Sequence, residues 1–215
     1  MSSGNPSLQA VGAKPAERMS IGDAIDVLIG LRDDRQIVVT CMGSSREWPR
    51  RCDHPLDLHH VPSAMGATIP LALGFALAQT EREVMTLTGD GSLLMNLGAL
   101  VTVIASGAKN LSVVLLDNGV YEITGGQRTA GQTAEVDFAG IARSVGFPNV
   151  AHFWDLGDWQ ARAAEVLRAR GPRFIWLEVA PEREDYLIKL LRPMLEQTAR
   201  LRAALGTNAA AQAKT

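Results

Sequence analysis

Three short turns in this sequence combine glycine with hydroxyl, carboxylate or amide side chains, and these are the residue types that bind charged ligands. They are Gly43-Ser44-Ser45, Gly89-Asp90-Gly91-Ser92 and Asp117-Asn118-Gly119, and each closely follows a short apolar run. Glycine lets the backbone approach an anion, and the N-terminus of a helix that follows such a turn offers unpaired N–H groups and a positive dipole end. The turns therefore predict a phosphate-binding site.

Asp90 would repel a bare phosphate, so its presence indicates a divalent cation between the two charges. Asn118 offers a neutral oxygen, and Mg²⁺ takes few protein oxygens while it keeps phosphate and water oxygens. A strand, the Gly89–Ser92 turn, an apolar helix and a second strand form one βαβ unit, which places Asp90 and Asn118 at the ends of adjacent parallel strands. Taken singly, Gly-Asp-Gly is most often a plain turn and Asn-Gly a loop signal, and only the combination predicts one shared metal ion.

Three further polar residues have two interpretations each. His59 and His60 are candidate catalytic proton donors, or they are an ordinary loop pair. Two adjacent histidines without another partner do not predict a metal site. Arg46 is a candidate for binding the acid group of a substrate, or it pairs with Glu47 or another surface acid.

The elements that must position these residues alternate between strand and helix. Strands are predicted at 37–41, 57–60, 84–88, 111–116, 149–152 and 174–179. Helices are predicted at 20–31, 63–79, 93–106, 137–145, 155–170 and 186–205, and a loop without period at 121–133. This alternation predicts an α/β fold of three layers, in which helices cover both faces of a mostly parallel sheet. Ligands bind such sheets beyond the carboxyl ends of the strands, where the three turns fall.

Length and composition describe a globular protein with one substantial domain. Of its 215 residues 47% are hydrophobic and 20% charged, and the net charge of −2 gives no reason to expect nucleic acid or an anionic membrane as partner. We expect a disordered leader at 1–18, one domain with the predicted phosphate site at 19–182, an amphipathic helix at 183–205 and a disordered tail at 206–215. That helix packs on its own domain or makes a subunit contact. No secretory signal or membrane span is predicted, and the two cysteines indicate reduced thiols, so a cytoplasmic location is expected.

The Gly-Asp-Gly turn and the Asp117-Asn118 pair, separated by 25 residues, resemble the motif of thiamine diphosphate-dependent enzymes, which begins GDG and usually ends NN. The resemblance implies that 19–182 is a diphosphate-binding domain and that Asp90, Asn118 and the backbone carbonyl of Val120 bind Mg²⁺. Asp117 replaces the first Asn of the motif, which is not a metal ligand. Ser63-Ala64-Met65-Gly66 is similar to the family's G-x-M-G segment, which implies that Met65 supports the bent cofactor and that the Ser63 carbonyl contacts its amino group.

Within that family the sequence is most similar to sulfopyruvate and phosphonopyruvate decarboxylases. Gly43-Ser44-Ser45-Arg46-Glu47 resembles their G-[FS]-[TS]-S-R-E segment, and the runs 96–100 and 117–127 resemble their corresponding stretches. The likeness implies a 2-oxo acid decarboxylase with thiamine diphosphate and Mg²⁺ as cofactors. The cofactor-binding residues that it implies are Gly43, Ser44, Ser45, Ser63, Met65, Gly89, Gly91, Ser92 and Tyr121.

The glutamate that activates the cofactor in this family belongs to a pyrimidine-binding domain, for which this chain has no room. The resemblance therefore implies a β subunit that needs an α subunit, in a hetero-oligomer with at least two copies of each chain. Glu122 joins His59 and His60 as a candidate catalytic residue, although it follows the metal motif and cannot replace the activating glutamate. A carboligase subunit, a 2-oxo acid oxidoreductase subunit and a non-catalytic cofactor-binding subunit remain as alternatives. The lack of a cysteine cluster disfavours the second, and intact Asp90 and Asn118 argue against the third.

Overall fold

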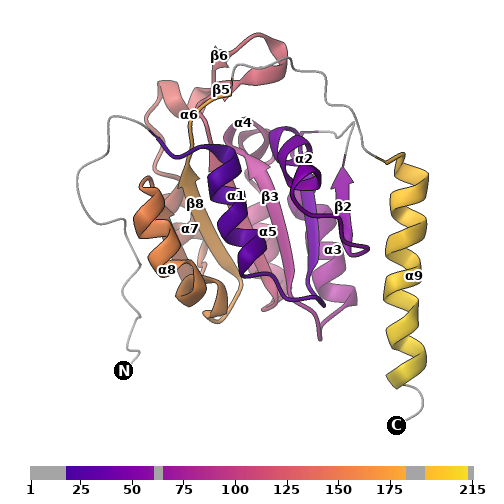
Figure 1. Cartoon of the computed structure of the whole chain (residues 1–215). Coiled ribbons are helices and arrows are strands. Elements are labelled where there is room, and N and C mark those ends of the chain that lie inside the picture. The colour runs from indigo at the N-terminus through magenta and orange to yellow at the C-terminus, as the bar shows by residue number, and fades with distance from the viewer. Residues whose placement is uncertain (1–17, 61–64, 183–191, 213–215) are drawn as a thin grey trace, which may run out of the picture.

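The computed structural model describes residues 18–60, 65–182 and 192–212, and its centre is a parallel sheet (Figure 1). Six strands pair in parallel in the order β2 (Asp57–His60), β1 (Ile37–Cys41), β3 (Val84–Gly89), β4 (Leu111–Asp117), β8 (Arg173–Glu178) and β7 (Asn149–Phe153). Strands β1, β3, β4 and β8 are buried almost throughout, as expected of parallel strands covered on both faces. The predicted α/β class is confirmed.

Helices cover the two faces of the sheet and give each face its own hydrophobic core (Figure 1). One face carries α1 (Ile21–Gly30) and α8 (Leu156–Arg168), and the other carries α3 (Thr68–Ala78), α5 (Ala99–Ser106) and α7 (Phe138–Val145). Helix α1 begins where the sequence predicts, because the Ser20 hydroxyl accepts a hydrogen bond from the Asp23 N–H at 2.9 Å. The fold therefore has the three layers that the strand–helix alternation indicates.

The C-terminal helix α9 (Met194–Gln212) packs beside the edge strand β2 (Figure 1). Leu201 is buried in the core of the α3–α5 face, and the Gln197 side-chain carbonyl accepts the His59 N–H at 2.8 Å. A side chain of α9 thus satisfies a backbone donor on the edge strand. The helix packs on its own domain, and the subunit contact stays a prediction: Leu195 is 84% exposed, and residues 187–191 lie outside the described residues.

The boundaries differ from expectation in three places. The single helix predicted at 93–106 is two helices, α4 (Asp90–Leu94) and α5, separated by a turn at 95–98. Helix α3 begins at Thr68, after a turn at 65–66. The segment predicted as a loop contains β5 (Val120–Tyr121), η2 (Glu122–Thr124), β6 (Gln127–Arg128) and α6 (Ala130–Thr133).

Short elements at the tip of β1 complete the upper edge of the sheet. They are α2 (Gly43–Glu47) and the 3₁₀ turn η1 (Trp48–Arg50). The predicted leader lies almost wholly outside the described residues, and α9 continues past residue 205. None of the described helices combines the length and the apolar character needed to cross a membrane.

Candidate functional site

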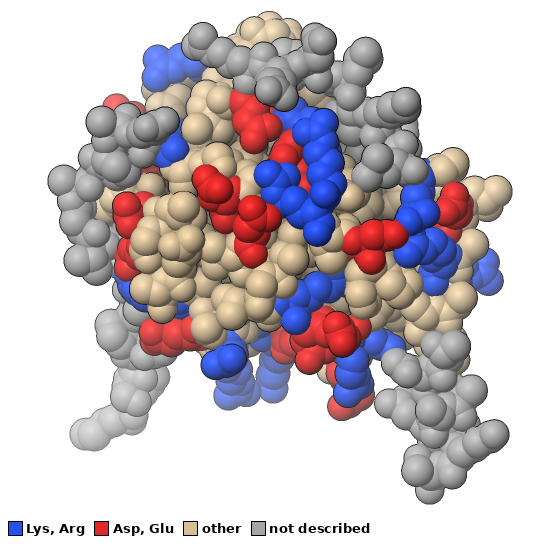
Figure 2. Space-filling model, in the orientation of Figure 1, with Lys and Arg blue, Asp and Glu red and all other residues tan. Residues whose placement is uncertain are grey.

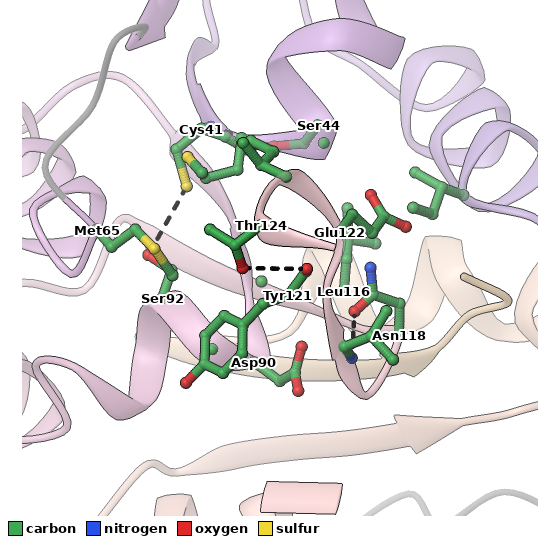
Figure 3. A pocket seen from close by; sticks show the side chains of 17 residues that line it. Cys41, Ser44, Met65, Asp90, Ser92, Leu116, Asn118, Tyr121, Glu122 and Thr124 are labelled. Atoms are coloured by element: carbon green, nitrogen blue, oxygen red, sulfur yellow. Dashed lines mark hydrogen bonds between the residues drawn. The ribbon is translucent and has the colours of Figure 1, made fainter. Parts of the chain in front are cut away.

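The carboxyl ends of β1, β3 and β4 open into one pocket, whose empty space together with the open solvent at its mouth is about 690 Å³ (Figure 3). Gly89 of β3 lies beside Leu116 of β4 in the parallel register, so Asp90 and Asn118 follow neighbouring strand ends. Both line this pocket, as the sequence predicts. Of the other expected site residues, Gly43, Ser44, Met65, Gly89, Gly91, Ser92, Val120, Tyr121 and Glu122 line it too.

Asp90 is a buried carboxylate, 1% exposed, at the start of α4. Its Oδ2 accepts a hydrogen bond from the Thr129 hydroxyl at 2.6 Å. Burial raises the pKa of Asp90, while the Thr129 hydroxyl and backbone N–H groups, among them that of Gly119, act in the opposite direction. Thr129, which the sequence analysis did not single out, therefore orients the carboxylate.

Asn118 closes the turn that brings Val120 to the pocket. Its side-chain oxygen accepts the Val120 N–H at 3.0 Å. Gly119 between them has φ +75°, and a Cβ on it would lie 2.6 Å from the Gln132 side-chain oxygen. The left-handed backbone favours glycine at this position, and a side chain there would also displace the end of the Gln132 side chain.

A second buried acid, Asp117, lies next to this pair. Its Oδ2 accepts a hydrogen bond from the Trp176 indole N–H at 3.0 Å, and its Oδ1 has no hydrogen-bond partner among the described residues. Burial, and then the negative charge of Asp90, raise the pKa of Asp117 to about 6. Within the described part of the chain neither carboxylate forms an ion pair, so a divalent cation beside them would relieve their mutual repulsion.

The rest of the pocket lining fits a ligand with a charged end and an apolar body. Apolar side chains of Ile21, Met42, Met65 and Ile123 line part of it, and among the residues that the structure describes no Lys or Arg lines it. Gly89 has room for a Cβ, whose nearest neighbour would be 3.9 Å away, so packing alone does not demand glycine there. Without a basic side chain, a diphosphate here would have to be neutralised by backbone N–H groups and a metal ion.

The turn that presents Met65 is held from α4. The Gly66 N–H donates to the Ser92 hydroxyl and the Gly66 carbonyl accepts from the Asn96 side-chain amide, both at 2.9 Å. Gly66 has φ +86°, and a Cβ on it would lie 2.8 Å from the Asn96 Cβ. Ser92 and Asn96 therefore fix Met65 relative to the Asp90 turn.

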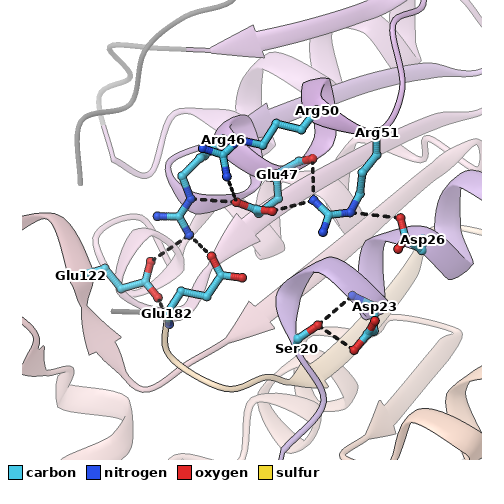
Figure 4. Close-up of polar contacts among 9 residues, drawn as sticks. All are labelled: Ser20, Asp23, Asp26, Arg46, Glu47, Arg50, Arg51, Glu122 and Glu182. Atoms are coloured by element: carbon cyan, nitrogen blue, oxygen red, sulfur yellow. Dashed lines mark hydrogen bonds and ion pairs between the residues drawn. The ribbon is translucent and has the colours of Figure 1, made fainter. Parts of the chain in front are cut away.

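Glu122 faces the pocket from one side and an ion cluster from the other (Figure 4). Arg46 is buried, and its guanidinium pairs with Glu47 at 2.9 Å and with Glu182, while Glu122 lies 4.0 Å away. The Glu182 N–H donates to Glu122 Oε1 at 2.9 Å. Arg46 thus pairs with acids, as one interpretation holds, but it does so in the interior and ties α2 to the segment after β8.

His59 and Ser45, two of the remaining candidates, do not line this pocket. His59 lines a separate pocket beside α9, and its Nδ1 lies 2.9 Å from the Thr40 hydroxyl, with burial lowering its pKa. Ser45 is buried below the β1 tip, 3.0 Å from the same Thr40 hydroxyl. His60 ends strand β2, and Ser63 lies outside the described residues. The structure therefore does not bring His59 to the pocket of Asp90 and Asn118.

Comparison with known proteins decides between the families that such a pocket suits. Residues 40–177 match the model of the thiamine pyrophosphate enzyme C-terminal TPP-binding domain. The chain belongs to the thiamine pyrophosphate enzyme family. The prediction made from the Gly-Asp-Gly and Asp-Asn motifs is confirmed, and the match spans the strand ends that form the pocket.

Two relatives place the chain more closely within this family. It is 38% identical over 163 residues to the sulfopyruvate decarboxylase β subunit of Methanothermobacter thermautotrophicus, covering 76% of this chain and 83% of that one. It is also 38% identical over 161 residues to the phosphonopyruvate decarboxylase of Streptomyces viridochromogenes, covering 75% of this chain but 40% of that enzyme. The prediction that the chain groups with thiamine pyrophosphate-dependent decarboxylases is confirmed.

A solved structure supports the fold. The X-ray structure of a thiamin diphosphate-dependent enzyme from Mycobacterium smegmatis superimposes with a TM-score of 0.65 over 82% of this chain and 34% of that one. At 22% identity this likeness concerns the fold alone.

Proposed function

We propose that this chain is the β subunit of a thiamine diphosphate-dependent 2-oxo acid decarboxylase of the sulfopyruvate or phosphonopyruvate type. The observation that carries the proposal is the pocket in which Asp90 and Asn118 meet from adjacent strands, with no basic side chain among its described lining residues. Asp90, Asn118 and the Val120 carbonyl would hold Mg²⁺, and the Gly43–Ser44 and Gly89–Ser92 turns would face the diphosphate. When bound, thiamine diphosphate supplies an electron sink for the carbanion left by loss of CO₂.

The residues of this chain bind and orient in this proposal. Ser92 and Asn96 hold the turn that presents Met65 to the body of the cofactor. Thr129 fixes the carboxylate of Asp90. Glu122 does not serve as the activating glutamate in this proposal, because it accepts the Glu182 N–H and lies beside Arg46. A separate α subunit would provide that glutamate. The name of the Methanothermobacter relative, a β subunit, supports such a partner.

Two measurements test the proposal. Isothermal titration calorimetry with thiamine diphosphate and Mg²⁺ should show binding that Asp90→Asn weakens by about 100-fold or more, because it removes one charged metal ligand. Asp155→Asn is the control, because Asp155 caps the N-terminus of α8 and does not line the pocket. This variant should bind like the wild-type chain. Equal affinities for the wild-type and Asp90→Asn chains would contradict the metal assignment.

The reaction is tested with the reconstituted pair of chains. CO₂ release is measured from sulfopyruvate, phosphonopyruvate and pyruvate. Sulfopyruvate or phosphonopyruvate should be turned over fastest. A carboligase is the second candidate, because the chain is 25% identical over 187 residues to the acetolactate synthase isozyme 1 large subunit of Escherichia coli. Formation of a carbon–carbon bond from two pyruvate molecules, with no turnover of sulfopyruvate or phosphonopyruvate, would favour that alternative.

A further inference from the structure

Helix α3 is apolar on every side although only one side faces the sheet. Of its residues, Ile69, Ala72, Leu73 and Ala76 pack into the core. The outer side is apolar too and consists of Pro70, Gly74, Leu77 and Ala78, all exposed, with Leu77 52% exposed. A helix that is hydrophobic all round is normally buried all round.

The neighbouring segment α4–α5 repeats this pattern. Helices α3 and α5 contact each other and share one core. Met95 is 57% and Val101 54% exposed, and Gly98 and Ala105 are exposed as well. The stretches 65–80 and 91–108 contain no Asp, Glu, Lys or Arg in a chain of which 20% is charged. We call the outer side of α3, the turn at 95–98 and α5 the uncharged face.

The opposite face of the sheet differs in just this respect. Figure 2 shows acidic and basic side chains interspersed over the side formed by α1 and α8. Asp23 and Asp26 of α1 and Glu165 and Arg168 of α8 are exposed there. The layer on that side carries charges where it meets water. The uncharged face instead exposes mainly apolar side chains, with Asn96 and Thr102 among them, and a surface of this kind marks a contact with another polypeptide.

We propose that the uncharged face binds the partner subunit, and specifically the polypeptide that corresponds to the part of phosphonopyruvate decarboxylase outside the match to this chain. That part amounts to about three fifths of the single-chain relative, whereas the β-subunit relative is covered over 83% of its length. The face is also continuous with the candidate cofactor pocket, because Met65 lines the pocket and Gly66 is bonded to Asn96 on the exposed turn. This inference rests on the proposed function and adds to it the surface on which the two chains meet.

The test uses two chains purified together, this chain and the polypeptide of the same organism that matches the remaining part of phosphonopyruvate decarboxylase. Leu77→Glu and Val101→Glu place a charge on the uncharged face, and Ala161→Glu places one on the exposed side of α8 as a matched control. We expect Leu77→Glu and Val101→Glu to weaken association by at least about tenfold, since a buried charge is costly, and Ala161→Glu to leave it unchanged. Circular dichroism melts establish that the variants are folded.

Hydrogen exchange on the wild-type pair gives a second reading that needs no variant. The amides of 68–78 and 95–105 should exchange more slowly in the pair than in this chain alone. Association that none of the substitutions affects, or no association at all, would overturn the proposal. It would also be overturned if light scattering showed this chain alone to be a dimer that Leu77→Glu dissociates, because the face would then bind a second copy.

Activity separates this inference from the proposed function. If the pair releases CO₂ but Leu77→Glu and Val101→Glu associate normally, the surface is wrong and the function stands. If association depends on the uncharged face but no 2-oxo acid is decarboxylated, the function is wrong and the surface stands.

Discussion

Asp117 is a buried carboxyl group with a charged neighbour, and this makes the stability of the chain depend on pH. Its pKa rises to about 6 in the folded state through burial and the charge of Asp90, compared with about 3.9 in an unfolded chain. The folded state therefore binds the proton of Asp117 more tightly than the unfolded state. The contribution of this group to stability falls as pH rises through the window from about 4 to 6.

We expect Asp117→Asn to stabilise the metal-free chain above that window. At pH 7.5 the free energy of unfolding should rise by about 1–3 kcal/mol, because the amide is neutral and still able to accept the Trp176 N–H. The difference should vanish near pH 4, where the native carboxyl is protonated. Urea unfolding in EDTA from pH 4 to pH 8 measures it, and a variant less stable than the wild type at pH 7.5 would refute the expectation.

Arg46 is the most buried of the three cations in the cluster of Figure 4. Arg46→Met should lower the free energy of unfolding by about 3–5 kcal/mol at pH 7, because Glu122 and Glu182 lose the cation beside them, while Glu47 keeps Arg50 and Arg51. Arg50→Met is the matched control: Arg50 also contacts Glu47, at 3.1 Å, but its side chain is 57% exposed, so it should cost less than about 1 kcal/mol. Chemical denaturation of both variants measures this, and equal losses would show that the buried position of Arg46 does not matter.

At the level of elements, the Met65–Gly66 turn couples the start of α3 to α4. Gly66→Ala should lower the free energy of unfolding by about 1–3 kcal/mol, because its φ of +86° disfavours a side chain and a Cβ would lie 2.8 Å from Asn96. Gly30→Ala is the control, since a Cβ at Gly30 would meet nothing within 4 Å, and it should be neutral or slightly stabilising. Thermal unfolding compares them, and the idea fails if both variants melt alike.

Much of the element plan follows from local pattern. The hydrophobic period and the Ser20 cap place α1, and the β-branched runs place the buried strands to within a residue or two. The break at 95–98 is not predicted, because Asn96 and Gly98 interrupt the apolar run only briefly. It coincides with the turn in which Asn96 donates to the Gly66 carbonyl, 30 residues away in sequence.

In the site, too, some features follow from local sequence and others depend on contacts with remote residues. Spacing alone brings Asp90 and Asn118 to adjacent strand ends, because a βαβ unit has little freedom in where its strands finish. The environment of Asp117 depends on Trp176 and that of Arg46 on Glu182, which are remote in sequence. The position of His59 away from the pocket depends on how β2 pairs beside β1, which no local pattern specifies.

At the level of the whole molecule, the candidate cofactor pocket unites segments that an unfolded chain holds apart. Residues of the β1, β3 and β4 ends line it together, so a ligand bound there stabilises the native state. At a ligand concentration about 100 times its dissociation constant the gain is about 2.7 kcal/mol, which for a chain of this size raises Tm by roughly 5–10 °C. We expect this shift with thiamine diphosphate and Mg²⁺ together, by scanning calorimetry.

The controls for this shift follow from the charges in the pocket. In the described part of the chain no basic side chain lines it, and Asp90 repels phosphate, so thiamine diphosphate in EDTA should leave Tm almost unchanged. Thiamine, which lacks the diphosphate, should give no shift even with Mg²⁺, and Asp90→Asn should abolish the full effect. If thiamine raised Tm as much as its diphosphate, the metal and the strand ends would not contribute to binding, and recognition would have to lie in the apolar part of the pocket around Met65 and Ile123.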